Sequence, residues 1–258
     1  MLLESEGQDW IGPNTGYNWF GYSDFYARNY NAAVNLLMWN TYYKTIAACN
    51  MVCASTDPET TNPDLMANLG QARAVRAYCY SILAQLYQFT YNAENASKPC
   101  VPIVHESLTA EQQAANPRAS LQEVYDFIMA DLNYAIPALE GWARADKAAS
   151  DQAVAYGLRA RVNMLLGNYA DAAEYAKMAI QVSGAQPYTL ADVSKPTFCH
   201  AEHNSVIWAN IVVESNDVVL TGIINWPSHV SSLYTDGYTG AGCYREICSD
   251  LYSKIPAT

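Results

Sequence analysis

The segment from Leu69 to Leu83 carries apolar side chains at helical spacing, and this periodicity limits the fold more than any other feature of the sequence. The spacing is about 3.6 residues, as expected for one face of a buried helix. The stripe comprises Leu69, Ala72, Cys79, Tyr80, Leu83, Leu86 and Tyr87. Arg76 lies within it, where an unpaired charge would be very costly to bury. We therefore expect Arg76 to anchor the structure by binding a carboxylate or loop carbonyls, rather than to contact a ligand.

Similar periodicity predicts that most of the chain is helical. The expected helices cover residues 24–55, 63–91, 121–136, 150–166 and 169–181. Ser120 and Glu123 have the spacing of a capping box at the start of the third helix. After Pro187 the stretches NSVIWANIVVE and DVVLTGII are β-branched, which favours strands or extended segments. Residues 1–24 and 224–258 show no clear period, and we expect them to be irregular.

The region 153–182 has the pattern of two helices in close contact, separated by a Gly-Asn-Tyr turn. Its small residues are Ala153, Ala155, Gly157 and Ala160 on the first helix and Ala172, Ala173 and Ala176 on the second. This pattern is typical of a tetratricopeptide (TPR)-like hairpin. The helices expected at 24–55 and 63–91 are joined by the turn-rich loop 55–64 and should form another antiparallel hairpin. Because one hairpin cannot bury its outer face, several should stack.

The composition disfavours several classes of partner. The net charge is −11 and no basic run occurs, so binding to nucleic acid or electrostatic binding to anionic lipid is not expected. The chain has 20 Tyr and 6 Trp, which combine an apolar body with a polar edge. This predicts either a polar aromatic interior or aromatic surfaces that meet ligands. No apolar stretch reaches the roughly 18 residues of a membrane-spanning helix, and the start MLLESEGQDWIG does not resemble a signal peptide.

No motif in the sequence predicts catalysis or metal binding. Pairs such as Glu202 and Glu214 could serve a glycosidase only at a spatial separation that sequence does not show. The segment CHAEH lacks the paired spacing of zinc sites, and there is no nucleophile elbow, P-loop or dinucleotide fingerprint. Seven cysteines without a Cys-x-x-Cys pair leave room for one or two disulfides. We expect no enzymatic activity, no metal site and no cofactor.

Six segments, in order over residues 35–210, carry a resemblance to a known family. They read LMWNTYYKTIAACNMV, GQARAVRAYCYSILAQLY, KPCVPIV, EVYDFIMADLNYAIPAL, AVAYGLRARVNMLLGNYADAAEYAKMAI and HNSVIWAN. Together they resemble the SusD/RagB family of glycan-binding lipoproteins of the Gram-negative outer membrane. The first matches through Trp39, Tyr43, Ile46 and Asn50. The second matches through Gly70, Ala72, Arg76, Ala77 and Tyr80, and it departs from the family pattern at Gln71, where Glu is usual.

The resemblance implies an all-α fold of stacked TPR-like hairpins, with an irregular side built from loops and a few short strands. We expect a single domain, with a helical core at 24–186 and a ligand-side region at 187–258. The implied protein is a glycan-binding lipoprotein at the cell surface that delivers nutrient to a TonB-dependent SusC-like transporter, without chemistry or cofactor. Since family members are longer, we expect this chain to be an N-terminal portion without the lipid anchor and the C-terminal part.

A glycan site needs exposed aromatic rings that stack on sugars, with polar groups beside them. Two loop clusters have this composition: Trp10, Tyr17, Trp19 and Tyr22 before the first helix, and Trp226, Tyr234 and Tyr238 near the C-terminus. The alternative is that these rings fill the protein's own loops or contact a partner. No ligand residue is carried over from the family, because its ligand residues vary between members. Tyr80 and Trp39, like Arg76, are expected to be structural.

Two other functions stay open at this stage. A RagB-like member of the same family would carry peptide instead of glycan, and the sequence does not separate the two. A TPR-like scaffold that binds a protein is a different class, and the aromatic loops and scarcity of basic residues disfavour it. The sequence does not reveal which glycan would be bound.

Overall fold

The computed structural model describes residues 10–11, 33–195, 200–216 and 246–256. Backbone contacts divide the chain into a unit of residues 39–211 and a second unit of residues 1–38 and 212–258. The predicted boundary at residue 187 stays a prediction.

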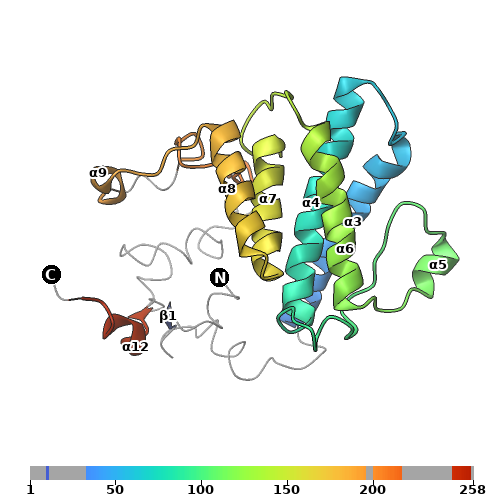
Figure 1. Ribbon diagram of the computed structural model, residues 1–258, viewed down its shortest axis with the longest axis horizontal. Coiled ribbons are helices and arrows are strands. Elements are labelled where there is room, and N and C mark those ends of the chain that lie inside the picture. Colours follow the sequence, from blue (N-terminus) through green and yellow to red (C-terminus); the bar gives the residue numbers. More distant parts are fainter. Residues whose placement is uncertain (1–9, 12–32, 196–199, 217–245, 257–258) are drawn as a thin grey trace. The chain divides into compact units, whose positions relative to one another are not determined.

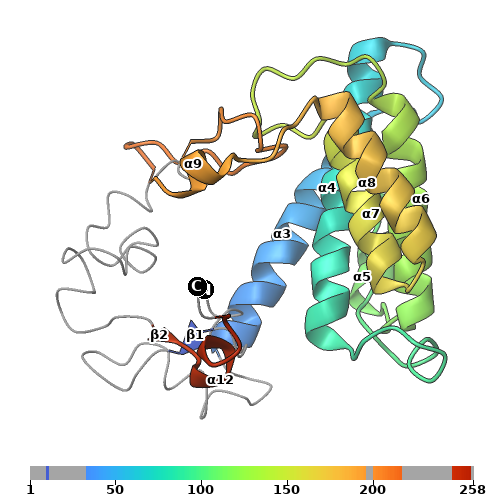
Figure 2. The same ribbon diagram turned by 60° about the vertical axis from the view of Figure 1, so that its left-hand side comes forward.

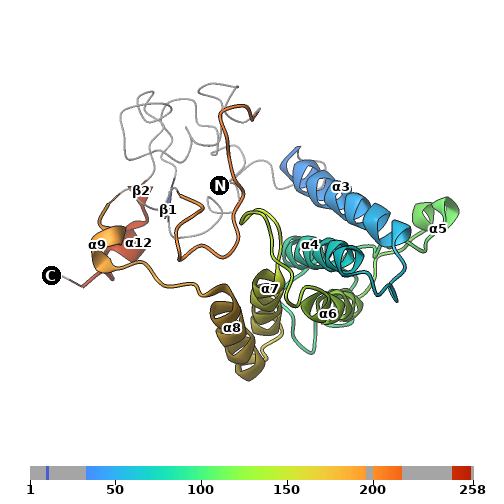
Figure 3. The ribbon, with the colours of Figure 1, turned by 90° about the horizontal axis from the view of Figure 1, so that it is seen from above.

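The larger unit is helical, as predicted. Its elements are α3 (Ala33–Ser55, within this unit from Trp39 on), α4 (Pro63–Tyr87), α5 (Ala110–Ala114), α6 (Leu121–Ala138), α7 (Gln152–Leu165), α8 (Tyr169–Ser183) and α9 (Leu190–Val193). In Figures 1 and 3, α4, α6, α7 and α8 run side by side. Helix α4 packs on α6, α6 on α7, and α7 on α8. The hydrophobic core therefore follows this row of helices.

The ends of the helices follow from capping residues. Asn62 caps α4 by accepting hydrogen bonds from the backbone N–H groups of Asp64 and Leu65. The predicted capping box of Ser120 and Glu123 is present at the start of α6. The prediction that α4 continues to residue 91 is wrong, because the helix ends at Tyr87 and the next residue is extended. Turn-forming residues follow, and they bond to one another instead of extending the helix.

Helices α7 and α8 form the predicted close hairpin. Gly167 makes the turn with φ of 78°, a conformation that glycine adopts without strain. Five of the nine buried residues of α7 and α8 are alanines: Ala153, Ala155, Ala160, Ala172 and Ala179. Ala173 was expected to line this contact and is exposed instead. The reason is helical register, since Ala172 and Ala179 are two turns apart and set the buried face.

Glycine also allows the close approach of α4 to α6. A Cβ atom added at Gly70 would lie 3.0 Å from Leu139 Cγ and 3.1 Å from Ala138 Cβ. No other residue fits there without a shift of its neighbours.

Helices α3 and α4 run in opposite directions, but they do not pack along their length like α7 and α8. Figure 2 shows α3 inclined to α4. Aromatic side chains span the space, as in the contact of Trp39 with Tyr87 at 5.1 Å between ring centroids. The extended segment 100–104 bonds to both helices: Tyr43 on α3 donates to Pro102 O, and Tyr80 on α4 donates to Val104 O.

Strands are few in the described residues. Residues 200–216 form turns and irregular chain and no strand, so of the two alternatives predicted for NSVIWANIVVE the strand is wrong. The stretch DVVLTGII lies outside the described residues. In the smaller unit, β1 (Trp10–Ile11) pairs antiparallel with β2 (Glu246–Ile247), followed by α12 (Ser249–Tyr252). None of the described helices has the length and apolar character needed to span a membrane.

Candidate functional site

The predicted ligand residues fall almost entirely outside the described part of the chain. Tyr17, Trp19 and Tyr22, and likewise Trp226, Tyr234 and Tyr238, lie outside the described residues. Trp10 is described only as a strand residue, whose backbone pairs with Ile247. Whether these rings form one surface therefore stays a prediction.

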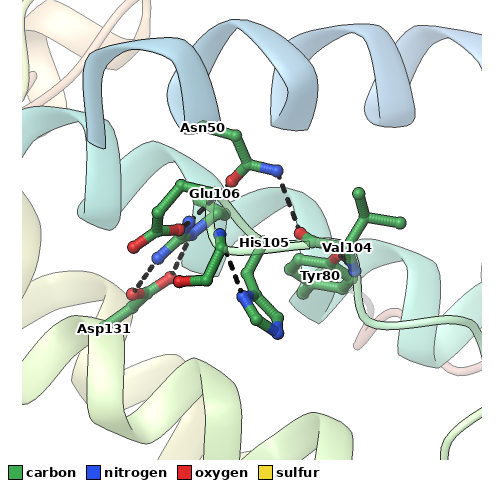
Figure 4. A network of polar contacts seen from close by, with 8 residues as sticks. Asn50, Tyr80, Val104, His105, Glu106 and Asp131 are labelled. Carbon is green, nitrogen blue, oxygen red and sulfur yellow. Dashed lines mark hydrogen bonds and ion pairs between the residues drawn. The ribbon is translucent and has the colours of Figure 1, made fainter. Parts of the chain in front are cut away.

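Arg76 on α4 lies at the centre of a buried polar network, and Figure 4 shows its partners Asn50, Glu106 and Asp131 pointing toward one another. Its Nε and Nη2 donate to the two carboxylate oxygens of Asp131 on α6, both at 2.8 Å. Its Nη1 donates to Asn50 Oδ1 on α3 at 2.6 Å and to Glu106 Oε2 at 2.5 Å. Arg76 is 2% exposed. The guanidinium thus ties together α3, α4, α6 and the segment after Val104, which is the arrangement expected of a structural anchor.

The electrostatics of this network favour the charged guanidinium. Burial lowers the pKa of Arg76, but hydrogen bonds and charge from Asp131 outweigh burial and hold the pKa above its usual value. Burial also raises the pKa of Glu106, yet its backbone hydrogen bond and Arg76 together bring that pKa below the usual value. For Asp131, burial raises the pKa and the hydrogen bonds from Arg76 oppose it. Both carboxylates of the network, Asp131 and Glu106, are thus ion-paired with the same guanidinium.

Segment 99–104 shows why the interior of this protein is rich in polar and aromatic side chains. This segment pairs with the backbone of residues 119–120 only around the isolated bridge between Pro99 and Ser120, so most of its carbonyls need side-chain partners. Each carbonyl from Pro99 to Val104 accepts a hydrogen bond. The donors include Tyr43, Asn50 and Tyr80, three residues on which the family resemblance rests. The Tyr80 hydroxyl also accepts from Val104 N at 2.7 Å.

A second aromatic group lies on the larger unit, at the surface. The Tyr78 and Trp208 rings meet edge to face, with centroids 5.4 Å apart. The indole N–H of Trp208 donates to Ala148 O at 2.9 Å, which holds the ring in place. These residues line a hollow of about 350 Å3 together with Ala209 and Asn210.

A longer open groove of about 630 Å3 begins at the same loop. It lies between the last turns of α3, the first turns of α4 and residues 148–150. Ala148 lines both the groove and the hollow.

Sequence reasoning missed both of these features. Trp208 was noticed only as part of the HNSVIWAN segment, and its partner Tyr78 lies 130 positions earlier in the chain. Tyr78 lies on α4 beside the apolar stripe, where it is half-buried. An aromatic residue at that position was the signal that could have indicated a surface ring. The partners of Arg76 were likewise unforeseen, because Asp131 lies 55 residues away.

No group of three or more metal-ligating side chains occurs in the residues that the structure describes. Within those residues, Cys49, Cys53, Cys79, Cys100 and Cys248 are free thiols. Burial raises the pKa of Cys79 to about 12 and that of Cys49 to about 11, so neither thiol is activated as a nucleophile.

The fold and the buried network define a class of protein, a TPR-like helical scaffold whose loops are free to carry a binding site. Residues 4–164 match the sequence model of the SusD-like family described as "Starch-binding associating with outer membrane". The chain belongs to this SusD-like family, whose members are non-catalytic binding proteins associated with the outer membrane. No curated protein sequence matches the chain significantly.

Solved structures of SusD-like proteins share the fold. A SusD-like carbohydrate-binding protein from Bacteroides vulgatus ATCC 8482 is 23% identical, with a TM-score of 0.71 over 83% of this chain and 45% of that one. A sugar-binding protein from the same organism is 21% identical, with a TM-score of 0.72 over 96% of this chain and 54% of that one. A laminarin-binding SusD-like protein is 21% identical, with a TM-score of 0.60 over 79% and 44%. The chain thus spans about half the length of these proteins.

Proposed function

We propose that this chain is part of a glycan-binding protein at the outer-membrane surface that delivers oligosaccharide to a TonB-dependent SusC-like transporter. The observation that carries the proposal is the family match over residues 4–164. The aromatic loop clusters that include Trp10, Trp19 and Trp226 are the proposed contacts. Because Trp combines a flat apolar face with a polar edge, it suits stacking on sugar rings.

The test is a titration of the purified chain, and of the whole reading frame that encodes it, against soluble polysaccharides and peptides, followed by Trp fluorescence. Laminarin is the first ligand to try, since a structural relative is a laminarin-binding protein. We expect a saturable response to one class of glycan. Single variants Trp10→Ala, Trp19→Ala and Trp226→Ala should each weaken binding about ten-fold, the loss expected for one aromatic contact worth about 1.4 kcal/mol.

Tyr169→Ala is the matched control, because Tyr169 is an aromatic residue on α8 that is 72% exposed and lies outside the proposed loops. It should bind glycan like the unchanged protein. A response to peptides alone would favour a RagB-like peptide carrier. If neither glycans nor peptides change the Trp fluorescence, the glycan-binding part of the proposal is wrong and only the partnership with a transporter stays to be tested. That partnership is tested by co-purification with a SusC-like transporter from outer membranes.

A further inference from the structure

The groove between α3 and α4 has an unusual chemical character. None of the residues that line its volume of about 630 Å3 carries a charge, although the protein as a whole has a net charge of −11. Its polar groups are amides and hydroxyls, including Asn68, Gln71 and Ser150. A charged ligand group would lose its water here without gaining a partner of opposite charge. The lining therefore suits a neutral polar ligand.

Some of these polar groups have no hydrogen-bond partner within the described part of the chain. Ser150 is 2% exposed, yet its buried hydroxyl has no hydrogen-bond partner among the described residues. Asn68 and Gln71 on α4 line the same groove, and their amides bond to no other described residue. The Ser150 oxygen is covered by the surrounding protein, so the groups that a ligand in the groove can reach directly are the amides of Asn68, which is exposed, and Gln71, which is half-buried.

The wall of the groove is held in place. Arg144 donates to Ala149 O at 3.0 Å and to Ile207 O at 2.6 Å. Ala209 N donates to Lys147 O at 2.9 Å, next to the bond from Trp208 to Ala148 O. Because these bonds fix the loop before any ligand arrives, the loop would lose little conformational entropy when a ligand binds.

We propose that the groove and the adjoining hollow bind one neutral oligosaccharide, with a sugar ring against Trp208 and sugar hydroxyls on Asn68 and Gln71. The continuity at Ala148 lets one ligand span both parts. Aromatic rings beside neutral amides and hydroxyls are the combination that recognises an uncharged sugar. The inference rests on the proposed glycan-binding function and deepens it. It names the ligand as uncharged and adds contact residues that belong to neither aromatic loop cluster.

The test measures affinity for neutral and acidic oligosaccharides with the chain carrying Asn68→Leu and Gln71→Leu together. Leucine is a good helix former, so α4 should stay intact, and circular dichroism checks this. Neutral laminarin and cello-oligosaccharides are compared with oligogalacturonate by calorimetry. We expect the double variant to bind the neutral ligand at least about ten-fold more weakly, because two hydrogen bonds to the ligand are lost.

Gln181→Leu is the matched control, because Gln181 is an exposed glutamine on α8 outside the groove, and its affinity should not change. A second variant, Trp208→Leu, should also weaken binding of the neutral ligand. If neutral glycan binds and the double variant binds it equally well, the groove assignment is wrong while the proposed function stands. Equal binding of oligogalacturonate through Asn68 and Gln71 would overturn the uncharged ligand class. If no glycan binds to the unchanged protein, both proposals fail.

Discussion

The α4–α6 pair and the α7–α8 pair are both packed helix pairs, but they are held together in different ways. In α7 and α8, five of the nine buried residues are alanines, and α8 also carries apolar side chains on its surface, with Ile180 54% and Val182 52% exposed. Between α4 and α6 the contact includes a fully buried ion pair, Arg76 with Asp131, which also binds α3 and the segment after Val104. The comparison shows that small residues suffice to join two neighbouring helices, whereas joining four distant segments takes a branched polar group.

The largest expected effect of a single change is at Arg76. Arg76→Met removes the partner of Asp131 and leaves a carboxylate buried, which typically costs about 3–5 kcal/mol of unfolding free energy. Lys177→Met removes an equally short pair with Glu174 on exposed α8, and exposed pairs contribute only about 0–1 kcal/mol. Urea unfolding of both variants gives the comparison.

A further variant separates lost charge pairing from lost packing. Arg76→Met with Asp131→Leu removes both charges and should regain part of the lost stability. Ligand affinity of the folded fraction should not change in Arg76→Met. Loss of binding at unchanged melting temperature would show instead that Arg76 contacts the ligand.

The next largest effect is expected from a Gly→Ala substitution, which can be made in both the α4–α6 pair and the α7–α8 pair. Gly70→Ala places a methyl group 3.0 Å from Leu139 Cγ, and such overpacking costs about 1–3 kcal/mol. Gly157→Ala on α7 places it 4.0 Å from Ala179 Cβ, which is ordinary contact. There the gain in helix propensity should stabilise the protein by about 0.5–1 kcal/mol. Thermal unfolding of both variants checks the opposite signs, and a stabilised Gly70→Ala would mean that α6 can shift away from α4.

These two pairs also show what the sequence could predict. The α7–α8 hairpin was predictable because its signals are local: the small residues, the Gly167 turn and the register of Ala172 all fall within about thirty positions. The capping box at Ser120 was predictable for the same reason. The partners of Arg76 were not, because Asn50, Glu106 and Asp131 lie 26, 30 and 55 residues away. A charge in an apolar stripe predicts that partners exist, but three-dimensional packing decides which they are.

The binding surfaces were harder to predict for a related reason. Loops carry no periodicity, so the clusters around Trp10 and Trp226 were chosen by composition alone. The groove at Asn68 and Ser150 had no signal in the sequence, since its walls come from two helices and a loop that meet only in the folded chain.

The smallest expected effect is the pH dependence contributed by Glu106. Its folded pKa lies below the usual value, since its backbone hydrogen bond and Arg76 outweigh burial. Its stabilisation is thus present above the unfolded pKa of about 4.3 and is lost as pH falls through the lower folded pKa. The side chain is 22% exposed, so solvent screening keeps this contribution at about 1 kcal/mol or less. Glu106→Gln should lower stability at pH 7 and flatten its loss between about pH 5 and pH 3.

Glu174→Gln on α8 is the matched control for this measurement, because Glu174 pairs with Lys177 where both side chains are more than half exposed. We expect the stability of this variant in urea to match that of the unchanged protein at pH 7 and between about pH 5 and pH 3. Subtracting the two curves isolates the part of the acid sensitivity that belongs to the buried network. If both variants flatten the curve equally, Glu106 acts as an ordinary surface carboxylate, and the network that distinguishes α4–α6 from α7–α8 consists of Arg76, Asp131 and Asn50 alone.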